Sequence, residues 1–418
     1  MTINDLTFVE NVALSVSDRH RSELVAASKV LRRDLAPRLS QIALGDGTVT
    51  LQNLVGSFRL GWDNAVRVSP KIGQVSGWSD AVVQLLEPTT RISVTGSRRS
   101  STSPRPHDLT AALALEFARR LERAVRQAGP IEVYERHDLS TRRPNGHLNI
   151  SRWVRGAILD PATFPVSRDE LSSANDFTRG LSVVAGQLSR SAVSSDLSSR
   201  LRRLQSAVIP GHPLPIHVSP SIARRALPAQ WAKYRPAWDL AAALLRNHSV
   251  FGDPGRSIGL EVAVEPWPLL ETLLSRTLAT LSALNPLYVV PKSQHSLLHH
   301  KDGSVATSVI PDGALRSDNG KVIATFECKY TAPRQTPLDS HVHQALTTAA
   351  ALEAPIAVLV YPNDEPPKTY SIPSFHGRPA TLVTVGLSLF SYTRGSGEVE
   401  RATLIRSILD DHQLMPTP

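Results

Sequence analysis

The sequence predicts a multidomain α/β protein in three parts: a mostly β N-terminal module, a helical middle region and a C-terminal α/β domain. Three observations predict this class. Strand-like segments separated by Gly, Pro and Asp fill the chain up to about residue 95, helical segments fill residues 168–250, and helix, hairpin, helix and strand alternate after residue 260. We therefore place the three parts at residues 1–155, 156–255 and 256–418.

Composition limits the classes of function. The 418 residues are enough for two or three domains, each with its own core. A net charge of +9 favours polyanionic partners such as nucleic acid, although arginine-rich coding gives the same bias. Cys328 is the single cysteine, so no internal disulfide can form and a reducing compartment, the cytoplasm, is expected. We expect no membrane association, because no signal-like N-terminus or long apolar run occurs.

The first part contains strand-like segments at residues 49–62, 64–77 and 89–96. Residues 108–130 then predict a helix, because apolar residues recur every four positions until Gly129-Pro130 ends the pattern. A further strand is expected directly after this helix. The middle part follows with helices predicted over 174–190, 194–208 and 229–249.

The third part begins with an amphipathic helix over residues 266–284. A hairpin over 311–331, a helix over 341–354 and a fully apolar strand over 355–362 follow. One more strand, TLVTVGLSLF, and a last helix, ERATLIRSILDDHQ, complete it. This order predicts a central sheet covered by helices.

The hairpin PDGALRSDNGKVIATFECKYT carries two acids and a lysine along a segment that should be buried. Asn319-Gly320 is a strong turn signal, and folding back there brings Asp312 alongside Glu327. Side chains alternate along a strand, so Glu327 and Lys329 share one face. We therefore expect two carboxylates and a lysine to converge.

Such a group can support Mg²⁺-assisted hydrolysis of a phosphodiester. Two carboxylates supply hard oxygen ligands, while waters and a substrate phosphate complete the octahedron. The ion polarises the phosphate, and the ammonium of Lys329 orients the attacking water. The alternative is a solvent-facing Glu and Lys beside a turn Asp, and the three residues alone do not decide between the two.

The wider context resembles the PD-(D/E)XK nuclease superfamily. Pro311-Asp312 stands at a strand start, Glu-Cys-Lys ends the hairpin, Gln344 lies on the next helix, and Glu271 lies on the preceding one. Further upstream the chain resembles the McrC family, the nuclease subunit of McrBC-type restriction systems for modified DNA. Segments matching that family run in its order over residues 131–362: VYERHDLSTRRPNGHLNISRWV, SRDELSSANDFTRGL, YRPAWDLAAALLRN, PWPLLETLLSRTL, PDGAL, FECKYT and VHQALTTAAALEAPIAVLVYP. The family often carries Asp-X-Lys where this chain has Glu-Cys-Lys.

The resemblance implies a PD-(D/E)XK endonuclease in the C-terminal domain that requires Mg²⁺, with Mn²⁺ able to replace it. Asp312 and Glu327 would bind the metal, Glu271 would be an added ligand or a supporting acid, Lys329 would position water, and Gln344 would be a further positioning group. The implied partners are DNA and a hexameric McrB-like AAA+ GTPase ring. The N-terminal module would dock on that ring and stimulate its nucleotide hydrolysis, in the restriction of foreign DNA.

Two other functions stay open. One is a standalone repair or defence nuclease of the same superfamily, and the other is a non-catalytic DNA-binding scaffold. The chain has no GxxxxGK[ST] motif, so we do not expect it to hydrolyse nucleotides itself.

Other candidate residues are histidines and the cysteine. HSLLHH, residues 295–300, suggests a metal site, but we expect a surface loop because no HExxH frame accompanies it. His341 and His343 fit equally a substrate contact or the exposed start of a helix. Cys328 should point away from Glu327 and Lys329 into the core.

Overall fold

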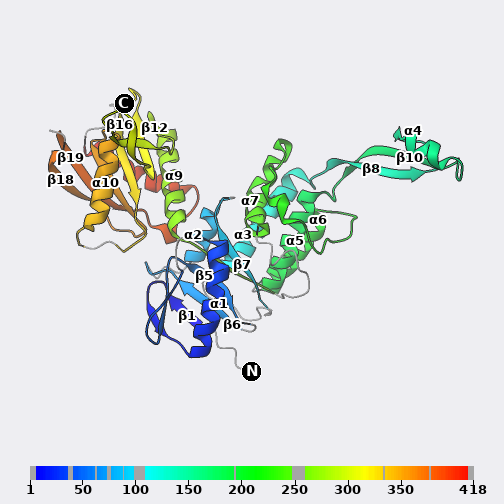
Figure 1. Cartoon of the computed structure of the whole chain (residues 1–418), viewed down its shortest axis with the longest axis horizontal. Helices are drawn as coiled ribbons and strands as arrows, with labels where there is room; N and C mark the ends of the chain where they lie inside the picture. The colour runs from blue at the N-terminus through cyan, green and yellow to red at the C-terminus, as the bar shows by residue number, and fades with distance from the viewer. Residues whose placement is uncertain are drawn as a thin grey trace.

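The computed structural model shows a mixed α/β protein, as predicted (Figure 1). A β-rich part contains the N-terminus, a second sheet carries the C-terminus, and a helical part extends into a long projecting arm (Figure 1). The structure describes residues 6–35, 41–61, 64–72, 77–87, 89–97, 109–192, 194–246, 259–332, 335–375 and 378–412.

The first sheet has the strand order β1-β6-β5-β11-β7. Its strands are β1 (Leu6–Val9), β5 (Val55–Leu60), β6 (Asn64–Ser69), β7 (Ile92–Ser97) and β11 (Gly259–Val264). A smaller sheet of order β2-β4-β3 lies beside it, formed by β2 (Ala13–Ser15), β3 (Ile42–Leu44) and β4 (Thr48–Leu51). The strand-like segments predicted near residues 49–62, 64–77 and 89–96 all contain strands.

Strand β11 pairs antiparallel with both β5 and β7. The predicted boundary at residue 256 assigns this strand to the third part, whereas its hydrogen bonds place it in the first sheet. The reason is nonlocal, because strand partners far apart in the sequence leave no mark on local periodicity. The chain thus returns to the first sheet before it enters the C-terminal unit.

The expectation of a mostly β N-terminal module misses a long helix, α1 (Asp18–Asp34). Ser17 caps it by accepting a hydrogen bond from the backbone N–H of His20. Leu24 and Leu31 are fully buried in a core that also contains Phe58 of β5. The apolar face of α1 therefore packs on the first sheet.

The helical part consists of α3 (Leu109–Ala128), α5 (Asp176–Ser191), α6 (Ser195–Ala207), α7 (Arg235–Leu245) and the 3-10 helices η1 (Pro220–Arg224) and η2 (Ala229–Tyr234). Helix α3 contacts α5, α6 and α7. Asn175 caps α5 by accepting from the N–H groups of Phe177 and Thr178. The helices predicted over 174–190 and 194–208 are confirmed, whereas the one predicted over 229–249 is divided into η2 and α7, and residues 247–249 lie outside the described residues.

The arm is an antiparallel ladder of β8 (Val133–Thr141) and β10 (Phe164–Ser172), with β9 (His147–Leu148) and α4 (Ile150–Gly156) at its end. Figure 1 shows it extending well beyond the helical part. Large apolar side chains are exposed along it, including Tyr134, Ile158 and Leu159. The prediction of a strand after α3 is confirmed, but β10 was not predicted.

The C-terminal sheet has the order β12-β15-β16-β17-β19-β18. Its strands are β12 (Leu287–Val289), β15 (Gly313–Ser317), β16 (Val322–Cys328), β17 (Ile356–Tyr361), β18 (Lys368–Phe375) and β19 (Arg378–Gly386). Helices α9 (Trp267–Leu284) and α11 (Ser396–Asp410) pack together and, with η3 (Leu389–Ser391), share one core with this sheet. Helix α10 (Asp339–Ala351) shares a separate core with β17. A helix-covered central sheet is therefore confirmed, with β18 as an unpredicted edge strand.

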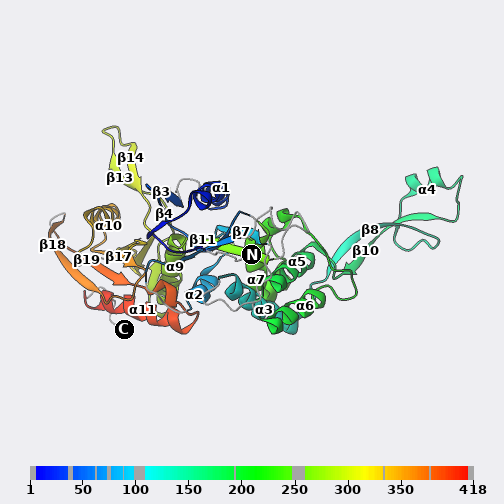
Figure 2. The same ribbon diagram turned by 90° about the horizontal axis from the view of Figure 1, so that it is seen from below.

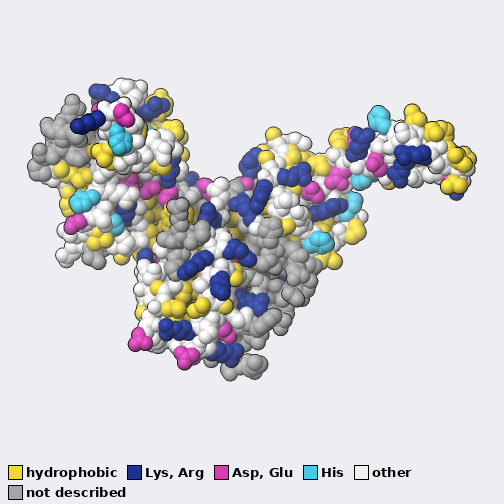
Figure 3. All heavy atoms as spheres, in the orientation of Figure 1, with side chains coloured by type: hydrophobic (Ala, Val, Ile, Leu, Met, Phe, Trp, Pro, Cys, Tyr) yellow, Lys and Arg dark blue, Asp and Glu magenta, His cyan; other side chains and the backbone are white. Residues whose placement is uncertain are grey.

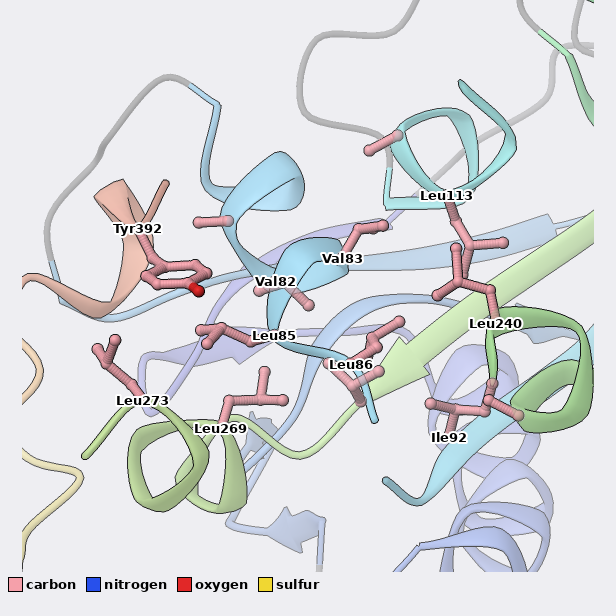
Figure 4. Packing of buried hydrophobic residues seen from close by; sticks show 14 of the residues in the cluster. Val82, Val83, Leu85, Leu86, Ile92, Leu113, Leu240, Leu269, Leu273 and Tyr392 are labelled. Atoms are coloured by element: carbon pink, nitrogen blue, oxygen red, sulfur yellow. The ribbon is translucent and has the colours of Figure 1, made fainter. Parts of the chain in front are cut away.

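Helix α2 (Trp78–Leu85) connects the parts through one continuous core. Figure 4 shows Val82, Val83 and Leu85 of α2 between Leu269 of α9 and Leu240 of α7. All of these side chains are nearly inaccessible to water. The C-terminal unit is consequently packed against the rest of the chain and not merely tethered to it.

Candidate active site

Hairpin β15–β16 positions the predicted cluster. The register pairs Gly313 with Phe326, so Asp312 stands beside the residues that follow Phe326. One carboxylate oxygen of Asp312, Oδ2, accepts a hydrogen bond from the backbone N–H of Cys328 at 2.8 Å. The predicted approach of Asp312 to the Glu327 segment is therefore confirmed as geometry.

Glu327 is 1% exposed, yet each of its carboxylate oxygens has polar partners. Oε1 accepts from the hydroxyl of Thr348 at 2.9 Å, and Oε2 accepts from Nε2 of Gln344 at 2.9 Å. The Nζ of Lys329 lies 3.4 Å from the same Oε2. Burial, and then the charge of Asp312, raises the pKa of Glu327 to about 7.

Lys329 and Gln344 complete a short hydrogen-bonded chain. The Nζ of Lys329 donates to Oε1 of Gln344 at 2.7 Å, while the amide nitrogen of Gln344 donates to Glu327. Gln344 and Thr348 lie one turn apart on α10, so this helix presents both to the end of β16. The local pattern placed Glu327 and Lys329 on one face, and α10 packing on β16 and β17 brings Gln344 to them.

A second group of charges surrounds Asp312. The Nζ of Lys292 lies 2.6 Å from Oε2 of Glu271 and 3.5 Å from Oδ1 of Asp312. Burial lowers the pKa of Lys292, but the hydrogen bond that Lys292 donates to Glu271 and the charges of Glu271 and Asp312 outweigh it, so the pKa is raised. Lys292 thus bridges the carboxylates of Glu271 and Asp312.

Sequence reasoning missed Lys292. It follows β12, and that strand pairs with β15 so that Val289 lies opposite Leu315. Because of this pairing, Lys292, just after the end of β12, lies near Asp312, just before the start of β15. A lysine two residues after an apolar run was the only local signal, and such a signal is common on exposed loops.

The carboxylates of Asp312 and Glu327 are suitable ligands for a hard divalent cation. The described part of the chain has no group of three His, Cys, Asp or Glu side chains arranged to hold a metal. Mg²⁺ commonly takes only one or two carboxylates and completes its shell with water and phosphate. Asp312 and Glu327 repel one another enough to contribute to the raised pKa of Glu327. A cation between them would relieve that repulsion.

The remaining candidate residues are the histidines of HSLLHH and Cys328. His295 and His299 lie on strand β13 (His295–His299), which pairs with β14 (Val305–Val309), so the expectation of a surface loop is wrong. These two strands stand away from the C-terminal sheet in Figure 2. His300 begins the turn after β13, where its N–H donates to the carbonyl of Ser304. Cys328 packs against the main core, as predicted.

His341 lies in the first turn of α10, and His343 lies at the start of the second. Nδ1 of His341 is 3.3 Å from the hydroxyl of Tyr361, and burial followed by the charge of Lys329 lowers the pKa of this histidine. His341 therefore lies near the cluster. The side chain of His343 has no contact there among the described residues.

A buried polar contact joins the first sheet to the strand that carries the cluster. Tyr330, the residue after Lys329, donates its hydroxyl to Oε2 of Glu10 at 2.7 Å. Lys71 lies 4.0 Å from the other oxygen of Glu10 and 4.5 Å from the Tyr330 ring centre. Burial raises the pKa of Glu10, while Lys71 and Tyr330 oppose the shift. Nothing in the local sequence signals this contact, because Glu10 and Tyr330 are 320 positions apart.

We expect Tyr330→Phe to lower the free energy of unfolding by about 2 kcal/mol, because it removes a hydrogen bond to a buried charged group. Urea unfolding measures the change. The control is Tyr134→Phe on the arm, where the side chain is 76% exposed, and no change is expected there. Equal urea midpoints of unfolding for the Tyr330→Phe and Tyr134→Phe variants would contradict the prediction.

The fold and the cluster together define a mixed α/β protein with a carboxylate, lysine and amide cluster at the end of a central strand. The sequence profile of the family described as "McrBC 5-methylcytosine restriction system component" matches residues 49–362. The chain belongs to this family, which confirms the resemblance found in its motifs.

A solved structure agrees with this assignment at the level of the fold. The chain is similar to a half-complex from a tetradecameric assembly of Thermococcus gammatolerans McrB AAA+ hexamers with bound McrC, with a TM-score of 0.66, 16% identity, and coverage of 97% of this chain and 100% of that one. It also matches the cryo-EM structure of the T. gammatolerans McrBC complex, with a TM-score of 0.47, 16% identity, and coverage of 67% and 88%. A search of curated proteins finds no match.

Within the part of the chain that the structure describes, no helix combines the length and the hydropathy that a membrane span requires.

Proposed function

We propose that the chain is the Mg²⁺-dependent DNA endonuclease subunit of an McrBC-type restriction complex. The observation that supports this most is the fully buried Glu327 carboxylate, which is held by Thr348, Gln344 and Lys329 and stands near Asp312. A buried charge is costly unless function or pairing retains it. A sheet kept only for packing or DNA binding has no need of this group, so the cluster disfavours the scaffold alternative.

Each side chain has a proposed role. Asp312 and Glu327 would hold the cation, which supplies polarisation of the scissile phosphate when bound. Lys329, anchored by Gln344 at 2.7 Å, positions the water that attacks the phosphorus atom. Gln344 orients both neighbours through its two amide atoms. Glu271 acts on Asp312 through Lys292, as a supporting acid or an added ligand.

The pKa of Glu327 makes cation binding depend on pH. Below pH 7 the carboxyl is mostly protonated, so a cation must displace a proton. We expect the association constant for Mg²⁺ to fall nearly tenfold for each pH unit below about 7 and to level off above it.

Titration calorimetry with Mg²⁺ at pH 6, 7 and 8, in two buffers of different ionisation enthalpy, measures the affinity and the protons released. Glu327→Gln is the control, since its amide does not titrate, and its weaker binding should not vary over this range. Binding by the natural chain that is equally tight at pH 6 and pH 8 would exclude Glu327 as a ligand.

We further propose that the partner is an AAA+ GTPase ring and that the arm is the element that docks on it. The similar solved assembly contains McrB AAA+ hexamers with bound McrC. In this chain the arm projects away from the body and exposes Ile158 and Leu159 near its end. Apolar side chains at such a position are costly in water and are typical of a protein contact. The chain would stimulate nucleotide hydrolysis in the ring.

The standalone nuclease is the remaining rival. Incubating the pure chain with plasmid DNA and Mg²⁺, with and without the ring and GTP, separates the two. We expect cutting only with the ring and GTP present. Cutting by the chain alone at the same rate would favour the rival.

A further inference from the structure

Helices α3 and α6 form a basic hollow that the proposed active site does not use. Its volume is about 410 Å³, and it is lined by Arg119, Glu122, Arg123, Arg126, Gln127 and Arg200. Four of these six side chains are arginines and one is acidic. The hollow is therefore strongly positive.

The charges in the hollow are only partly balanced. The carboxylate of Glu122 forms ion pairs with Arg200 of α6 and with Arg126, the latter at 3.5 Å. Arg119 and Arg123 are exposed, and neither has an ion-pair partner among the described residues. Arg202 and Arg203 add two exposed positive charges on α6. Glu122 thus pairs with Arg126 and Arg200, while the guanidinium groups of Arg119 and Arg123 remain available to bind an anion.

The spacing of these arginines suits a repeating anion. Arg119, Arg123 and Arg126 lie on one face of α3, because they are four and three positions apart. They span about 10 Å along the helix axis at 1.5 Å per residue. One strand of a DNA duplex presents a phosphate about every 3.4 Å along its axis, so several phosphates fall within this reach.

We propose that the α3–α6 hollow binds the phosphate backbone of duplex DNA. This deepens the proposed function, since it assigns DNA binding to a surface separate from the Glu327 cluster. Guanidinium groups suit this ligand, because they donate two parallel hydrogen bonds to phosphate oxygens. Lys and Arg side chains recur over the helical part and the arm in Figure 3, among Asp, Glu and His side chains. The contact is with the backbone and so does not depend on sequence.

The test is the double variant Arg119→Ala/Arg123→Ala in the full chain. Its Kd for a fluorescent 30-base-pair duplex is measured by anisotropy in EDTA, at several salt concentrations. Losing two phosphate contacts should reduce the slope of log K against log salt by about 1.8 and weaken binding on the order of 10- to 100-fold at 0.1 M salt. Arg119→Lys/Arg123→Lys should restore most of the slope.

The matched control is Arg19→Ala/Lys29→Ala on α1, which removes the same charge from exposed positions of another helix. It should keep the slope of the natural chain. An Arg119→Ala/Arg123→Ala variant that keeps the salt slope and the Kd of the control overturns the proposal. If that variant binds DNA normally and instead no longer co-elutes with the AAA+ ring, the hollow is a protein contact and the proposal is also overturned. Glu327→Ala is assayed in parallel and should bind DNA normally without cutting it. If it cuts, the proposed function fails while the result on the hollow stands.

Discussion

Glu327→Ala and Lys329→Ala are each expected to abolish DNA cleavage by the chain assembled with its AAA+ ring, GTP and Mg²⁺. Glu327 would supply a metal ligand and Lys329 a water-positioning group, and neither has a substitute in the cluster. We expect a loss of at least about 10³-fold in each case, which is of the order found for removing one member of a catalytic group.

The double variant sharpens this prediction. Residues that act as one unit are strongly non-additive, so Glu327→Ala/Lys329→Ala should be little worse than either single variant. The assay is single-turnover cleavage of a modified DNA substrate. Glu353→Ala, at a position after α10 outside the cluster, is the control and should cleave normally. Natural cleavage rates in either single variant would remove the active-site assignment.

Folding must be checked because Glu327 is buried. Removing it leaves the hydroxyl of Thr348 and the amide of Gln344 without one acceptor. Glu327→Gln keeps the size and shape of the side chain: its amide oxygen can accept from Gln344, and its NH2 group can donate to the hydroxyl of Thr348, which also donates to the carbonyl of Gln344. It is therefore the better variant for separating chemistry from stability. It should unfold at a similar urea concentration to the natural chain and still fail to cut.

Removal of the arm tip is the second change with a large expected effect. Residues 142–163 connect β8 to β10, and Thr141 lies opposite Phe164 in the ladder. Replacing them with a two-residue Asn-Gly turn leaves that ladder able to form. We expect this variant to lose co-elution with the ring and stimulation of its GTP hydrolysis.

Asp312→Ala should show the opposite behaviour: it should still bind the ring and stimulate GTP hydrolysis, but it should no longer cleave DNA. Nucleotide turnover by the ring and gel filtration of the mixture measure both variants. Stimulation by the variant without the arm tip, or loss of stimulation in Asp312→Ala, would mean that other surfaces contact the ring. Deleting the whole N-terminal part is a poorer test, because β11 would lose its partners β5 and β7.

Much of the fold could be predicted because its signals are local. The helices over 108–130 and 266–284 follow from apolar residues at helical spacing, and the β15–β16 hairpin follows from Asn319-Gly320. Helix α1 was missed although Ser17 caps it, and β10 and β18 were missed because each carries polar residues typical of exposed strands. These failures concern elements whose identity depends on a packing partner.

The sequence by itself determined that Glu327 and Lys329 share a face and that Asp312 folds back beside them, because strand alternation and a tight turn act over a few residues. Only the tertiary structure decided that Lys292 joins Glu271 to Asp312, and that Tyr330 bonds to Glu10 of the first sheet. Those contacts depend on which strands pair and which cores merge. Such choices are made by the free energy of the whole packed chain, and no local pattern encodes them.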